Sequence, residues 1–213
     1  MAVRLQILTA EHASLMASRS LAWNESFARG GMYLSTLSGA MVALGLIAGL
    51  DRVGDLFFLF AMVILPVVLF IGLATFIRMG AANYHEGLTV AGMNRIRGAY
   101  LEIAPELEPY FVMGVHDDLP GLARTMAVPP HLPPIVHLLA ATSFVVSVLN
   151  AVIAGALAAV VLARFVTTSV VPTAGLAILV FVLVLVAQTR SARSNVRRTQ
   201  RENRPMSGPR SEG

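Results

Sequence analysis

The sequence has no cysteine and no lysine, and few of its residues are charged. Without cysteine the chain can form no disulfide, no thiolate metal site and no cysteine nucleophile. Only 13% of the residues are charged and 56% are hydrophobic, whereas a soluble domain carries about 25% charged residues. All 16 cationic side chains are arginine. We interpret this mainly as typical of a GC-rich bacterial genome; selection of arginine for bidentate phosphate binding is the alternative.

Four long runs of the chain contain no charged residue and no histidine. At about 1.5 Å per helical residue, each run can cross a hydrocarbon core of roughly 30 Å, which takes about 20 mainly apolar residues. The sequence therefore predicts an all-α integral membrane protein, with four transmembrane helices in two hairpins and helical cytoplasmic extensions. The runs are Gly30–Leu50, Leu56–Ile77, Leu138–Ala163 and Phe165–Thr189.

The distribution of arginine predicts the orientation. Fourteen arginines lie in the two terminal segments and the central segment, and only Arg52 and Arg164 lie in the two short connections. By the positive-inside rule, both termini and the central segment face the cytoplasm. We expect a multi-pass protein of the bacterial plasma (inner) membrane. The expected order is an amphipathic N-terminal helix at 1–29, hairpins at 30–77 and 138–189, a helical segment with a proline-rich elbow at 78–137, and an arginine-rich tail at 190–213.

Small residues recur at every fourth position in the first and third runs. Such stripes let helix backbones approach closely, so we expect them to face protein, within the chain or in a homo-oligomer. The second and fourth runs are bulkier and are expected to face lipid. The helix-packing candidates are Gly31, Ser35, Gly39 and Ala43 in the first run, and Ala151, Gly155 and Ala159 in the third.

Asn150 is the only strong polar group at depth within the runs, and Ser147 and Ser143 precede it at helical spacing. Two interpretations stay open: a hydrogen-bonded clamp between helices, or a polar ring in the pore of a symmetric oligomer. The runs hold no Asp, Glu, Lys, Arg or His, which is unusual for a proton- or cation-coupled transporter.

Charged residues flank the first hairpin. Glu25 and Arg29 are four positions apart and can pair on one helix. If the first run lined a pore, this pair would form charged rings at its inner mouth, with Asp51 and Asp55 at the outer one.

The central segment carries a net charge of −2 and the tail +5. We interpret the histidines and acids of the central segment as solvated surface rather than a metal site, and we expect no metal and no cofactor. The tail can bind the central segment, a cytoplasmic protein partner or the anionic headgroups of the bilayer. Nucleic-acid binding is not expected. The tail candidates are Arg190, Arg193, Arg197, Arg198 and Arg201.

The chain contains no nucleotide-binding loop, nucleophile elbow, metalloprotease helix or kinase motif, so we do not expect an enzyme. Two functions follow from the pattern. The first is an oligomeric, channel- or pore-forming membrane protein. The alternative is a non-conducting scaffold or sensor that binds a cytoplasmic partner through its central segment and tail.

Several stretches resemble a family of uncharacterised multi-pass membrane proteins from actinobacteria and related bacteria. The resemblance covers most of the chain up to Asp118 and implies an origin rather than an activity. The stretches are Thr9–His12, Ser18–Ser20, Asn24–Arg29, Ala91–Arg97 and Ala104–Phe111.

The predicted topology is also similar to that of Orai-type calcium channel subunits, which have four helices, both termini inside and a first helix rich in small residues. Those channels need a carboxylate in the first helix as an ion filter. This chain has none between Glu25 and Asp51, so the similarity does not extend to calcium selectivity.

Overall fold

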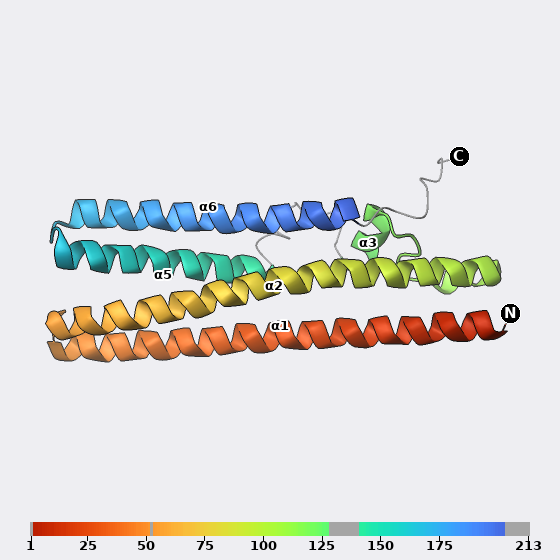
Figure 1. Ribbon diagram of the computed structural model, residues 1–213, viewed down its shortest axis with the longest axis horizontal. Helices are drawn as coiled ribbons and strands as arrows, with labels where there is room; N and C mark the ends of the chain where they lie inside the picture. Colours follow the sequence, from red (N-terminus) through yellow and green to blue (C-terminus); the bar gives the residue numbers. More distant parts are fainter. Residues whose placement is uncertain (1, 52, 128–140, 203–213) are drawn as a thin grey trace. The chain divides into compact units, whose positions relative to one another are not determined.

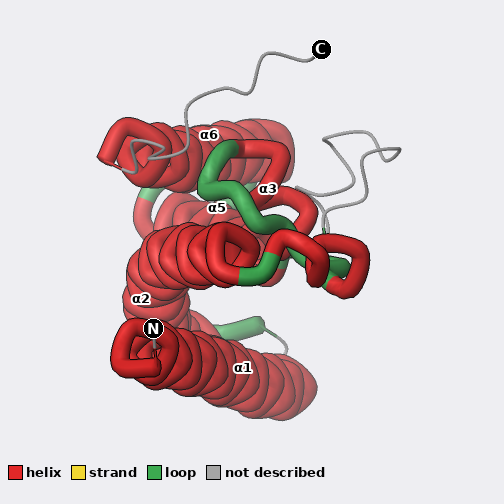
Figure 2. Tube along the Cα trace, turned by 90° about the vertical axis from the view of Figure 1, so that its right-hand side faces the viewer, coloured by secondary structure: helices red, strands yellow, loops and turns green. Residues whose placement is uncertain are grey.

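The described part of the chain is mainly helical. A computed structural model describes residues 2–51, 53–127 and 141–202, apart from the side chains of Asp51 and of residues 196–202. These ranges contain helix and connecting segments but no strand (Figure 1 and Figure 2). The elements are α1 (Ala2–Asp51), α2 (Asp55–Ile103), the 3₁₀ helix η1 (Pro105–Tyr110), α3 (Leu119–Thr125), α5 (Thr142–Phe165) and α6 (Val170–Glu202).

Four of these helices, α1, α2, α5 and α6, are long enough and apolar enough to cross a membrane. The prediction of an all-α protein with four membrane-spanning helices is confirmed. The helices form two hairpins, since only residues 52–54 separate α1 from α2 and only residues 166–169 separate α5 from α6. The protein is therefore a multi-span integral membrane protein.

The first two helices are much longer than a membrane span requires. α1 has 50 residues and α2 has 49, against about 20 for a span. The amphipathic segment expected at the N-terminus is the first half of α1, not a separate helix. α1 contains no proline, and Pro66 is the one proline inside α2, so nothing in the sequence forces a break where the apolar runs meet the polar extensions.

The chain packs into two compact units, which we name the extension unit and the membrane unit. The extension unit consists of the described residues of Met1–Glu25, Ala81–His137 and Ser194–Gly213. The membrane unit consists of those of Ser26–Gly80 and Leu138–Arg193. The proline-rich elbow at 129–134 lies outside the described residues.

The core of the membrane unit draws on α1, α2 and α5. Its buried members are Tyr33, Val68, Phe76, Met79, Val146 and Ile153. The second run thus contributes large side chains to the core, which differs from its expected lipid-facing position. The reason is that α2 has two faces: Ala61, Gly72 and Thr75 let it approach its neighbours, and its other face stays exposed. The apolar span of α6 is not buried by the rest of the chain.

Candidate functional site

A polar network joins three helices inside the membrane unit. The Tyr33 hydroxyl on α1 donates a hydrogen bond of 2.9 Å to Oδ1 of Asn150 on α5. Nδ2 of Asn150 donates a hydrogen bond of 3.3 Å to Oε1 of Gln188 on α6. Tyr33 and Asn150 are both 0% exposed. A polar pair sealed in an apolar bundle holds its helices in one register, because separating the partners leaves unsatisfied groups in a medium without water.

Gly72 of α2 makes room for this network. A Cβ atom at position 72 would overlap Oδ1 of Asn150 and would lie 2.8–2.9 Å from the ring of Tyr33. No other residue type provides this space, because glycine alone lacks the Cβ. α2 is therefore the one spanning helix that borders the site with its backbone rather than with a polar side chain.

The network lies near one end of the apolar runs. Tyr33 is three residues from the start of the first run and Gln188 is one residue from the end of the fourth, so Asn150 lies at the level of these run ends. The sequence had suggested a position near the middle of the third run. Asn150 is nine positions into α5, since the helix begins at Thr142.

The serines that accompany Asn150 act within their own helix. The Ser147 hydroxyl donates to the Ser143 carbonyl at 2.8 Å, a bond that satisfies the hydroxyl locally. Gln188 has one buried nitrogen, Nε2, that finds no acceptor among the described residues. The enclosed polar site thus consists of Tyr33, Asn150 and Gln188.

The two small-residue stripes have different surroundings. In the third run Ala151 and Gly155 are buried, and a Cβ at Gly155 would lie 2.7 Å from the carbonyl oxygen of Ala177 on α6. Ala159 is half-buried. In the first run Gly31, Ser35 and Gly39 are exposed and Ala43 is half-buried. Added Cβ atoms at Gly31 and Gly39 would meet no described atom within 4 Å.

The charged candidates lie at the two ends of the first hairpin. Glu25 is half-buried and Arg29 is exposed, one helical turn apart on α1. Asp55, at the opposite end of the hairpin, pairs with Arg164 of the second hairpin at 3.1 Å. The side chain of Asp51 lies outside the described residues.

In the extension unit, one carboxylate oxygen ties the two long helices together. Oε1 of Glu86 on α2 accepts hydrogen bonds from Nη2 of Arg19 at 3.0 Å, Nε of Arg19 at 3.3 Å and Nε1 of Trp23 at 3.0 Å. A guanidinium bound in this way is oriented as well as attracted.

His12 of α1 packs edge-on against Tyr100 of α2, with ring centroids 6.2 Å apart. Its Nε2 atom is buried and has no hydrogen-bond partner among the described residues. Burial, and secondly the positive charge of Arg97, lower the pKa of His12 below its ordinary value of 6.5. Burial, and secondly the charge of Arg19, likewise lower the pKa of Arg97. His12 is therefore held as a neutral ring beside a cation.

The loop after η1 is fastened to α2 by polar contacts. Asn94 donates from Nδ2 to the His116 carbonyl at 2.8 Å and accepts from the Thr125 hydroxyl at 2.8 Å. Arg95 Nε lies 2.6 Å from Oδ2 of Asp117, whose side chain is 1% exposed. Asp118 caps α3 by accepting from the Gly121 amide at 2.8 Å.

These contacts give structural roles to residues that sequence reasoning had placed on a solvated acidic surface. Within the described ranges, no group of three or more histidine, aspartate or glutamate side chains comes together to hold a metal. In the tail, Arg190 and Arg193 are not buried, and the side chains of Arg197, Arg198 and Arg201 lie outside the described residues.

Sequence reasoning singled out Asn150 but missed Tyr33, Gln188 and Gly72. Tyr33 and Gln188 were recognisable as the polar groups near the ends of the first and fourth runs, at depths that antiparallel helices can match.

Comparisons of the chain with protein-family models, with curated proteins and with solved structures found no match. Functional conclusions for this membrane protein therefore rest on its own geometry.

Proposed function

We propose that the protein is a non-conducting membrane scaffold or sensor, which anchors a compact helical unit at the bilayer and binds a protein partner with it. The enclosure of Asn150 by the chain's own helices supports this proposal, because an amide already bonded to Tyr33 and Gln188 is not free to line an aqueous pore. The proposal includes no enzymatic activity and no nucleic-acid partner.

The observation that carries the proposal is the apolar surface of the extension unit after α2. Tyr110 is 78% exposed and Val112 is 74% exposed, and Leu107, Met113 and Leu119 are also exposed. Glu106 and Glu108 are exposed in the same segment. Exposed apolar side chains rimmed by charge are typical of protein interaction sites. A partner with apolar anchors and a basic rim would match this segment, which we name the docking segment (105–119).

The proposed side of the membrane follows from the arginine distribution, by which the termini and the extension unit are cytoplasmic in a bacterial inner membrane. The partner is therefore a cytoplasmic or peripheral protein. Cysteine-scanning accessibility tests this orientation, since reagents that do not cross the bilayer should label Val112→Cys only after the membrane is opened.

The docking segment is tested by photocrosslinking and affinity capture in membranes of the source organism. The double variant Tyr110→Ser, Val112→Ser is expected to reduce recovery of a captured partner at least five-fold. Ala13→Ser, Ala17→Ser is the matched control, because both alanines are exposed on α1 of the same unit. Equal recovery with both variants, or no partner enriched by the wild-type protein, would refute the docking segment.

A second candidate is a homo-oligomer that forms a pore around α1. The exposed positions of Gly31, Ser35 and Gly39, with open space around the two glycines, favour it, since lipid cannot fill such a groove as well as a second helix can. Native mass measurement should then show an oligomer that Gly39→Leu dissociates. Conductance in planar bilayers that Gly39→Leu abolishes would favour the pore. An oligomer without conductance would support self-assembly through α1 and reject the pore.

A further inference from the structure

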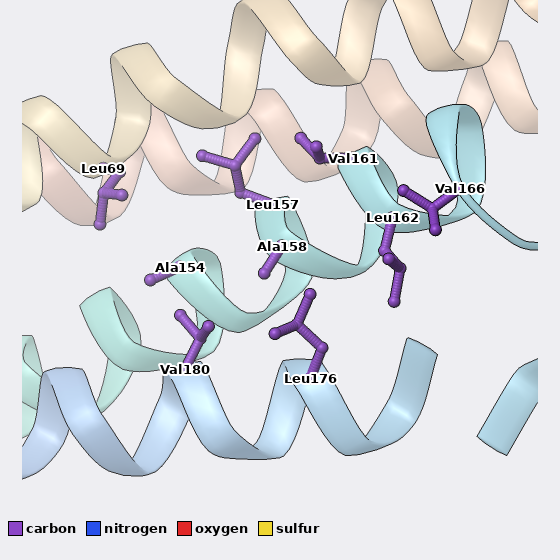
Figure 3. A pocket seen from close by; sticks show the side chains of 9 residues that line it. All are labelled: Leu69, Ala154, Leu157, Ala158, Val161, Leu162, Val166, Leu176 and Val180. Carbon is purple, nitrogen blue, oxygen red and sulfur yellow. The ribbon is translucent and has the colours of Figure 1, made fainter. Parts of the chain in front are cut away.

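An apolar groove runs along the membrane unit between α5 and its neighbours (Figure 3). It has a volume of about 420 Å³, and all nine of its lining residues are aliphatic. Leu69 comes from α2, Ala154, Ala158 and Leu162 from α5, and Leu176 and Val180 from α6. The alanines of α5 form the floor of the groove, because their side chains are shorter than those of the leucines and valines around them.

The groove has the length of one membrane leaflet. Its lining along the third span extends from Ala154 to Val166, the residue that follows α5. This is twelve residue steps, or about 18 Å at 1.5 Å per residue. Half of a hydrocarbon core of roughly 30 Å is about 15 Å. The groove therefore follows α5 from four residues beyond Asn150 to the end of the span, where the α5–α6 turn begins.

A pair of opposite charges lies at the turn end of the groove. Arg164 is flanked in sequence by the lining residues Leu162 and Val166. Its Nη2 atom lies 3.1 Å from Oδ1 of Asp55, and the two side chains are 45% and 87% exposed. The guanidinium carbon also lies 6.0 Å from the ring centroid of Phe58. A guanidinium carries five N–H donors, so one ion pair leaves it able to bind a further anion.

We propose that this groove binds one acyl chain of a zwitterionic aminophospholipid, with the lipid phosphate on Arg164 and its ammonium group on Asp55. The pair of Arg164 and Asp55 determines which lipid headgroup is preferred. Arg164 matches the phosphate, and Asp55 matches the amine while repelling a lipid whose headgroup is only negative. A slot lined by aliphatic side chains at this depth excludes water and accepts hydrocarbon.

The size of the groove favours an acyl chain over a second copy of this protein. A helix with its side chains is at least about 10 Å wide and fills about 1,400 Å³ over a length of 18 Å, more than three times the groove volume of about 420 Å³. A single hydrocarbon chain is thinner than a helix and can follow the slot. The site depends on neither the scaffold nor the pore proposal.

Native mass spectrometry of the full-length protein, released from nanodiscs of equal parts phosphatidylethanolamine and phosphatidylglycerol with identical chains, tests the proposal. The wild-type protein is expected to retain one phosphatidylethanolamine at least three-fold more often than phosphatidylglycerol. Ala158→Phe fills the groove and should reduce retention at least five-fold. Ala156→Phe is the matched control, because Ala156 is exposed on the same helix and does not line the groove.

Two charge variants test the headgroup contacts separately. Arg164→Gln should lower retention of both lipids, and Asp55→Asn should remove the preference for the amine lipid while keeping a bound chain. Helix content by circular dichroism shows whether each variant is folded. Unchanged retention in folded Ala158→Phe, or no preference in the wild-type protein, overturns the proposal. So does a dimer without retained lipid that Ala158→Phe dissociates, which would mean that a second copy fills the groove.

Discussion

The Tyr33 hydroxyl and Oδ1 of Asn150 lie 2.9 Å apart, although 117 positions separate the two residues in the chain. The bond connects the first and second hairpins and is fully buried. Because Asn150 also reaches Gln188 on α6, one amide links three of the four spans. Pairing of the two hairpins is therefore specified by polar contact as well as by shape.

The first prediction concerns that bond. Tyr33→Phe keeps the ring and removes the hydroxyl. We expect a loss of about 0.6 kcal/mol, and at most about 1.7 kcal/mol, in the free energy of unfolding, since these are the average and the maximum for hydrogen bonds between membrane helices. Unfolding in mixed micelles measures it. Tyr110→Phe is the control, since Tyr110 is exposed; equal destabilisation by both variants would contradict the clamp.

Gly72→Ala is expected to destabilise the membrane unit more than Tyr33→Phe does. The new methyl group must displace Asn150 or Tyr33, because a Cβ at position 72 overlaps the amide oxygen of Asn150, and overpacking of this kind costs about 1–3 kcal/mol. Gly45→Ala is the matched control, because nothing lies within 4 Å of a Cβ there. A thermal unfolding temperature lowered equally by both variants would contradict the close approach of α2.

His12 should make the packing of α1 on α2 sensitive to pH in the extension unit. Burial and the charge of Arg97 lower the pKa of His12 below 6.5, so its contribution to stability is complete above that value. The contribution is lost as pH falls through the lowered pKa. The fluorescence of Trp23, the only tryptophan in the chain, reports the change, because its indole is bonded to Glu86 on α2.

His12→Phe separates this effect from any direct titration near the tryptophan. The phenyl ring retains the edge-on packing against Tyr100 and cannot be charged. We expect the component of the fluorescence change that belongs to His12 to disappear in this variant. An identical pH profile in the two proteins would show that His12 does not couple to the packing.

Asp117→Asn should loosen the loop that precedes α3. The variant removes the charge that faces Arg95 at 2.6 Å from a side chain that is 1% exposed. Arg95 keeps access to solvent, so we expect a cost of about 1–3 kcal/mol rather than that of a fully buried pair. Hydrogen exchange of amides 111–125 measures it. Asp118→Asn is the control, because asparagine also caps a helix well; similar exchange in both variants would contradict the role of the ion pair.

The class of fold could be predicted from the sequence, whereas the arrangement of its helices could not. The four uncharged runs decide the spans on their own, because length and hydropathy are local properties. The packing of one helix against another, by contrast, depends on the surfaces of both helices together. Side-chain size alone suggested that the second run faces lipid, yet Gly72 and Ala61 bring that helix into the core beside its own bulky residues.

Of the residues in the buried polar site, only Asn150 was predicted from the sequence. Asn150 stands out because a strong polar group in an apolar run needs a partner. Tyr33 and Gln188 were recognisable as polar groups near the ends of their runs, but pairing them with Asn150 requires the relative depth of three helices. His116 and Asp117 were interpreted as surface for a similar reason, since only the folded loop brings them to Asn94 and Arg95.

The shortness of the two hairpin turns has a consequence for biogenesis. Only residues 52–54 and 166–169 separate the paired helices, so with the proposed cytoplasmic termini insertion would carry very little polar chain across the bilayer. The charged side chains that must cross belong to Asp51, Arg52, Asp55 and Arg164, each at a transient cost of about 3 kcal/mol at the bilayer centre. Each hairpin can therefore enter the membrane as a single preassembled unit, with the apolar surface of its two helices driving the step.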